Sequence, residues 1–128
     1  MATTYHESGL SEKAQEIHRA LTSMCEELEA VDWYNQRVDV SDDPELKAVL
    51  EHNRNEEIEH ACMVMEWLRR TMPEFDEHMR IYLFKSAPIT QLEELAEQGE
   101  AAEGDASPQP AAHNSGSDLG LGNLKKGA

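Results

Sequence analysis

Residues 46–67, LKAVLEHNRNEEIEHACMVMEW, decide the fold because a stripe of positions repeats through them every three to four residues. This spacing is typical of an α-helix that packs against other helices. The stripe consists of Leu46, Leu50, Asn53, Glu57, His60, Val64 and Trp67. Its ends are apolar and its middle is polar. A carboxylate at such a position destabilises the fold unless a cation or strong hydrogen-bond donors meet it.

Glu57 and His60 stand three residues apart, so one helical surface presents a carboxylate and an imidazole together. Metal-binding helical bundles use the Glu-x-x-His spacing in this way. The alternative is a core histidine satisfied by its neighbouring glutamate, and a lone Glu-x-x-His motif leaves that alternative open. The residues before this helix help to choose between the metal site and the satisfied core histidine.

The same rhythm runs through residues 11–39 and predicts an earlier helix. Its apolar positions are Leu10, Ala14, Ile17, Leu21, Met24, Leu28, Val31 and Val38. The break between the two helices is the segment VSDDP at 40–44, where Asp43 has the position of an N-cap and Pro44 the first helical position. A loop this short makes the two helices an antiparallel hairpin.

In such a hairpin, residues equally far along the chain from the turn lie at the same height, and the turn centres near residue 42. Glu27 is therefore level with Glu57, and Met24 with His60. Glu27 lies at the edge of the core face and can therefore point inward. Two independent patterns converge at one height, which favours a metal site over a satisfied core histidine. Oxygen and nitrogen ligands without thiolates suit iron, manganese or zinc.

One hairpin supplies too few ligands to close such a site. Two copies related by a two-fold axis would supply four carboxylates and two imidazoles, the ligand set of di-iron and di-manganese carboxylate bundles. Cys25 and Cys62 lie well round their helices from this face, and no Cys-x-x-Cys motif is present. The sequence therefore predicts an all-α chain that forms half of a four-helix bundle, completed by dimerisation.

Three segments carry a family resemblance: MCEELEAVDWY at 24–34, HNRNEEIEH at 52–60 and EWLRR at 66–70, with IYLF and APIT following at 81–90. In order and spacing they resemble the encapsulated ferritins. The resemblance implies a ferritin-like half-bundle that forms dimers, and five such dimers form a ring of ten chains. It also implies a di-iron ferroxidase centre with Glu27, Glu57 and His60 as ligands. Members of this family oxidise Fe(II) to Fe(III) and deliver iron inside an encapsulin nanocompartment.

Glu26 and Glu29 lie on the face of the first helix opposite Met24, with Trp33 one turn further along. An exposed acidic pair is usually only solvated. The resemblance implies instead a metal site in the ring interior, where the two glutamates near Trp33 gather Fe(II) before it is oxidised. Tyr34 is a further candidate beside the centre, with interface packing as the alternative. Asn53, one turn before the Glu-x-x-His pair, is a candidate for orienting a ligand.

The chain changes character after the hairpin. We expect short helices at about 74–84 and 90–98, the second beginning with a capping box at Thr90, so that residues 1–98 form the folded part. Residues 99–117 lack large apolar side chains and indicate a flexible linker. The end of the chain, 118–128, is either a frayed terminus or, as its resemblance implies, an encapsulin cargo-loading peptide. Its apolar positions are Leu119, Leu121 and Leu124.

Composition limits the function further. The 128 residues carry a net charge of −15, which would repel phosphates and argues against nucleic-acid and membrane partners. The N-terminus lacks the apolar core of a signal peptide, so we expect a cytoplasmic protein, and the family resemblance implies that it lies inside an encapsulin compartment. The favoured function is a ferroxidase that uses iron. A non-enzymatic metal-binding scaffold and a di-iron peroxidase are the alternatives.

Overall fold

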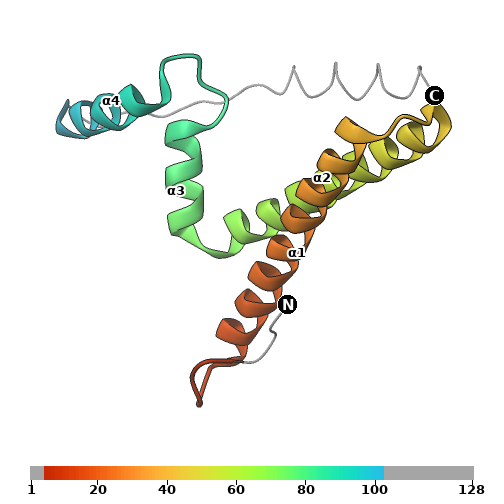
Figure 1. Cartoon of the computed structure of the whole chain (residues 1–128). Coiled ribbons are helices and arrows are strands. Elements are labelled where there is room, and N and C mark those ends of the chain that lie inside the picture. Colours follow the sequence, from red (N-terminus) through yellow and green to blue (C-terminus); the bar gives the residue numbers. More distant parts are fainter. Residues whose placement is uncertain (1–4, 103–128) are drawn as a thin grey trace, which may run out of the picture. The chain divides into compact units, whose positions relative to one another are not determined.

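The computed structural model describes residues 5–102, which contain helices and connecting turns but no strand (Figure 1). The helices are α1 (Glu12–Val40), α2 (Pro44–Thr71), α3 (Pro73–Tyr82) and α4 (Ile89–Ala102). The prediction of an all-α fold is confirmed for this part of the chain. The predicted cargo-loading peptide, with Leu119, Leu121 and Leu124, lies outside the described residues, as does the predicted linker from residue 103 onward.

Side-chain caps set the ends of the two long helices. Ser11 accepts a hydrogen bond from the Ala14 amide at 3.1 Å and begins α1. Asp43 accepts from the Glu45 and Leu46 amides at 2.9 and 3.3 Å and begins α2, with Pro44 at its first position. Only three residues separate the helices, and Figure 1 shows them side by side and antiparallel. The predicted hairpin is confirmed, and its first helix differs by one residue at each end.

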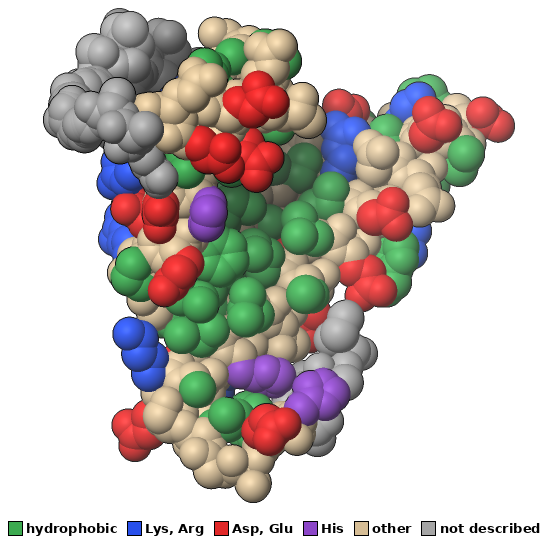
Figure 2. Space-filling model, turned by 90° about the vertical axis from the view of Figure 1, so that its left-hand side faces the viewer, with side chains coloured by type: hydrophobic (Ala, Val, Ile, Leu, Met, Phe, Trp, Pro, Cys, Tyr) green, Lys and Arg blue, Asp and Glu red, His purple; other side chains and the backbone are tan. Residues whose placement is uncertain are grey.

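Packing within a single hairpin buries few side chains. On α2, Leu68 is fully buried and Ala61 is 3% exposed, whereas Leu46 and Trp67 of the predicted stripe are 51% and 41% exposed. The space-filling view shows hydrophobic side chains gathered at the surface (Figure 2). Because α1 covers only one side of α2, part of the apolar stripe stays in contact with water. Apolar side chains that a helix leaves exposed in this way favour contact with another chain.

Ion pairs join the end of α2 to the start of α3. The Arg69 guanidinium donates to Glu66 at 2.8 Å and also pairs with Asp76 of α3. Arg70 donates to Glu66 as well, and the two arginines lower the pKa of Glu66 to about 2. Arg80 donates to Asp76 from the next turn of α3. Arg69 therefore links two carboxylates across the break that Pro73 makes in the helix.

The shorter helices depart from prediction at their ends. Helix α3 stops at Tyr82 rather than Phe84, because the Phe84 backbone has φ of +61° and leaves the helical region. Helix α4 begins at Ile89, where the Gln91 amide already bonds the Pro88 carbonyl, so Thr90 lies inside the helix and is not its N-cap. It continues to Ala102 through Gly99, past the predicted end at residue 98. The surrounding Ala, Glu and Gln residues are strong helix formers that outweigh one glycine.

The chain divides into two compact units between Arg80 and Ile81. The first contains the hairpin and most of α3, and the second contains α4. Among the described residues, none of the helices is both long enough and apolar enough to cross a membrane.

Candidate metal centre

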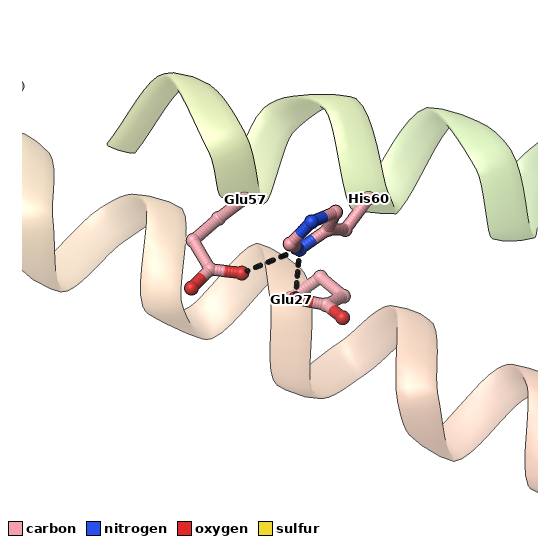
Figure 3. Close-up of side chains that lie close together, drawn as sticks. All are labelled: Glu27, Glu57 and His60. Atoms are coloured by element: carbon pink, nitrogen blue, oxygen red, sulfur yellow. Dashed lines mark hydrogen bonds and ion pairs between the residues drawn. The ribbon is translucent and has the colours of Figure 1, made fainter. Parts of the chain in front are cut away.

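Glu27 of α1 and Glu57 and His60 of α2 point toward one another in the space between the two long helices (Figure 3). The His60 Nδ1 atom lies 3.2 Å from Glu57 Oε1 and 3.8 Å from Glu27 Oε1. One ligand atom from each of the three side chains falls within 4.8 Å of the others. The prediction that these three side chains lie close together is confirmed, and among the described residues no other group of three or more such side chains does so.

The register between the helices is close to the predicted one. Glu27 faces Glu57, as the short loop requires, but it also approaches His60, for which the predicted register gives Met24 as the partner at the same height. Long side chains at neighbouring heights reach across the gap, so a single glutamate on α1 serves both residues of the Glu-x-x-His pair.

The two carboxyl groups share a hydrogen bond, which shifts their pKa values in opposite directions. A hydrogen bond with Glu57 raises the pKa of Glu27 above its usual value, and partial burial and the Glu57 charge act in the same direction. The same hydrogen bond with Glu27 lowers the pKa of Glu57, and His60 lowers it further. A hydrogen bond with Glu57 raises the pKa of His60, with both glutamate charges contributing. The cluster thus attracts positive charge, whether protons or a metal ion.

The donor set fits a divalent first-row metal such as iron, manganese or zinc. Two carboxylates and one imidazole are hard to borderline ligands, and no thiolate from the described residues joins them. The side chains of His60, Glu27 and Glu57 are 43%, 27% and 25% exposed. An ion held by three ligands at so open a place would keep positions for water or for ligands from a second chain.

The other predicted residues lie around this cluster without joining it. Glu26 and Glu29 are exposed, and Trp33 lines a shallow surface hollow with Gln36 and Arg37. Tyr34 is half-buried with its ring under the Arg37 guanidinium, 5.2 Å from the ring centre. The metal-uptake role of Glu26, Glu29 and Trp33, and the role of Tyr34, stay predictions. Asn53 is half-buried and has no hydrogen bond to the cluster, so its role also stays a prediction.

Sequence reasoning missed Glu56. Its Oε1 atom lies 3.9 Å from His60 Nε2, on the side of the ring opposite the cluster. Its Oε2 atom lies 3.6 Å from His52 Nε2. The spacing of four residues in both directions along α2 was a usable signal, because side chains four apart on a helix are neighbours. The adjacent Glu57 belongs to the Glu-x-x-His motif, which is the more specific pattern.

Comparison with known proteins finds relatives that are named as encapsulated ferritin-like or encapsulin cargo proteins. A profile described as EncFtn-like matches residues 2–86. An encapsulated ferritin-like protein from Rhodospirillum rubrum is 54% identical over 116 residues, which cover 91% of this chain and 82% of that protein. The encapsulin nanocompartment cargo protein EncC from Myxococcus xanthus is 33% identical over 101 residues, which cover 78% and 77% of the two chains.

A solved structure is similar in fold as well as in sequence. The crystal structure of protein ne0167 from Nitrosomonas europaea has a TM-score of 0.65 and 54% identity. The match covers 66% of this chain and 96% of the other.

Proposed function

The chain belongs to the EncFtn-like family, and we propose that it is a ferroxidase that oxidises Fe(II) to Fe(III) at a di-iron centre. The observation that carries the proposal is the convergence of Glu27, Glu57 and His60 from two helices. These ligands suit iron, and the cluster is open enough for Fe(II) to arrive as a substrate. The family relationship favours iron over manganese or zinc.

The centre is shared between two chains. A two-fold contact would place two copies of the Glu27, Glu57 and His60 cluster together, giving four carboxylates and two imidazoles for two ions. The exposed apolar residues of α2, among them Leu46, Met63 and Trp67, favour assembly on packing grounds. The family resemblance supports a further assembly of five such dimers into a decameric ring.

The chemistry balances with either of two oxidants. Each of two Fe(II) ions gives up one electron. Dioxygen that takes two electrons and two protons becomes hydrogen peroxide, and hydrogen peroxide that takes the same becomes two molecules of water. Within this scheme Glu27 and Glu57 bind and neutralise the ions, and His60 supplies a neutral ligand. Paired ions about 3.5–4 Å apart are the arrangement that other two-metal sites use.

Fe(II) oxidation by the metal-free protein tests the proposal. The wild-type chain should consume dioxygen when Fe(II) is added, and Glu57→Gln should remove most of this activity. Glu59→Gln is the matched control, because it changes the same charge two residues away on the exposed side of α2. Activity per chain should also fall on dilution as dimers dissociate. Equal oxidation by the two variants would refute the assignment of Glu57.

The alternatives predict different outcomes in the same assay. A non-enzymatic scaffold would bind Fe(II) at the cluster without consuming any oxidant. A di-iron peroxidase would turn over hydrogen peroxide with another reductant and without net oxidation of the added Fe(II). A ferroxidase consumes an oxidant in proportion to the Fe(III) that it forms.

We also propose that an encapsulin shell is the partner of the chain, which places it in a nanocompartment within the cytoplasm. Support comes from relatives that are named as encapsulated or as encapsulin cargo. The proposed contact is the segment 118–128, in which Leu119, Leu121 and Leu124 would lie in an apolar groove of the shell. In the same scheme Glu26 and Glu29 gather Fe(II) beside Trp33 on its way to the centre.

A further inference from the structure

The two nitrogens of the His60 ring face different surroundings. Nδ1 faces Glu57 at 3.2 Å and Glu27 at 3.8 Å, which are the other two members of the cluster. Nε2 faces away from them, toward Glu56 Oε1 at 3.9 Å. A cation held by both carboxylates would therefore meet His60 through Nδ1. The ring proton would then be on Nε2, which faces the Glu56 carboxylate at 3.9 Å.

A histidine that binds a metal through one nitrogen usually donates its other N–H to a carboxylate, a carbonyl or water. This outer contact fixes the tautomer, holds the ring at the right angle and makes the ligand nitrogen more basic. We propose that Glu56 is the positioning residue for His60: in the metal-loaded protein its carboxylate accepts the Nε2–H hydrogen bond and keeps Nδ1 turned toward Glu27 and Glu57. The proposal rests on the proposed metal centre.

The surroundings of Glu56 support this role. His52 lies 3.6 Å from its Oε2 atom, one helical turn before it, so the carboxylate lies between two imidazoles along a single face of α2. The remaining gap of 3.9 Å to His60 is one that a small rotation of this half-exposed side chain would close to a hydrogen bond.

Zn(II) binding by the full-length protein separates positioning from charge. Glu56→Ala, Glu56→Gln and Glu59→Ala each remove one negative charge beside His60. Glu56→Gln alone keeps an oxygen that accepts the Nε2–H bond. We expect Glu56→Ala to weaken Zn(II) affinity about tenfold, the lower end for such outer contacts because the side chain is half exposed. Glu56→Gln should recover most of the loss, and Glu59→Ala should bind as the wild type does.

A spectroscopic measurement checks the hydrogen bond directly. Solid-state NMR of the Zn(II)-loaded protein with ¹⁵N-labelled histidine should show His60 protonated at Nε2, with that proton hydrogen-bonded in the wild type and in Glu56→Gln. The bond should be lost in Glu56→Ala. His60→Gln assigns the signal.

The outcomes distinguish this inference from the proposed function. Equal Zn(II) affinity in Glu56→Ala and Glu59→Ala would overturn the positioning role, as would Glu56→Gln binding as weakly as Glu56→Ala. If His60→Gln bound Zn(II) as tightly as the wild type, the metal centre itself would be wrong, and the role of Glu56 would be refuted with it.

Discussion

Replacing Glu27 by Gln should stabilise the metal-free protein and remove most of the stabilisation that metal gives. Glu27 and Glu57 face each other across the hairpin with ligand oxygens within 4.8 Å. Each loses hydration on folding and gains a like charge as its neighbour. Glutamine keeps the shape and the hydrogen-bonding ability of the side chain while removing one of the two charges.

The separation of the two carboxylates sets the size of the effect. The ligand atoms fall within 4.8 Å of one another, and two unit charges at that upper limit repel by about 3.5 kcal/mol at an effective dielectric constant of about 20, and by about 1 kcal/mol at the value for water. Roughly a quarter of each side chain is exposed, so we expect a gain of about 1–3 kcal/mol in the free energy of unfolding.

The size of the effect depends on pH. In the folded protein the raised pKa of Glu27 lets it keep a proton that it loses in the unfolded chain. Glu27 therefore helps stability below the ordinary glutamate pKa, and that help is lost as pH rises through its raised value. The advantage of Glu27→Gln over the wild type should accordingly grow from acid toward neutral pH.

Urea unfolding at fixed protein concentration, with and without chelator, measures both effects. Glu29→Gln is the matched control, because it makes the same charge change on an exposed position of α1. Adding Zn(II) at a hundred times its dissociation constant should stabilise the wild type by about 2.7 kcal/mol and Glu27→Gln by much less. The reasoning fails if the two variants unfold alike without metal, or if Zn(II) stabilises Glu27→Gln as strongly as the wild type.

Three further predictions concern protons, packing and targeting. Zn(II) affinity should increase as pH rises through the raised pKa of His60, because Glu57 helps the imidazole to hold a competing proton; an affinity that titration calorimetry finds independent of pH would contradict this. Leu68→Ala should lower the free energy of unfolding by about 2–5 kcal/mol, and Leu46→Ala at a half-exposed position should cost far less in the same urea experiment. Truncation after Ala102, where α4 ends, should leave Fe(II) oxidation intact and abolish co-purification with an encapsulin shell, and normal loading of the truncated chain would show that the tail is not the signal.

Local chemistry made the hairpin predictable. Asp43 and Pro44 are strong signals for a helix start, and a three-residue loop leaves antiparallel packing as the natural outcome. The loop length fixed the register closely enough to bring Glu27 opposite Glu57. The Glu-x-x-His spacing then placed His60 on the same surface. Each of these inferences depends on neighbours along one or two helices, which is where sequence patterns are most informative.

Other features depend on competition that a pattern does not resolve. Thr90 and the residues after it fit a capping box, but the helix starts one residue earlier at Ile89. The burial of the α2 stripe is not decided by one chain either, since Trp67 fits the stripe and is 41% exposed in a single hairpin, where a second chain would have to cover it. The direction of the His60 ring, which exposes Nε2 to Glu56, depends on rotamers on both helices and on no single spacing.

Charge and packing at the centre of the hairpin oppose each other when no metal is present. The apolar side chains of α2 favour a second chain on that face, and the same contact would move Glu27, Glu57 and their symmetry mates out of water. Without cations that transfer is unfavourable, because like charges meet where hydration is lost. A divalent ion makes this transfer favourable, because two carboxylates that repel each other are then both attracted to the ion between them. In the proposed shared centre, metal would bind the assembled form more tightly than the single chain, and it would then strengthen assembly by the same free energy. The polar interruption in the apolar stripe of α2 would thus make assembly depend on the ion that the centre is proposed to oxidise.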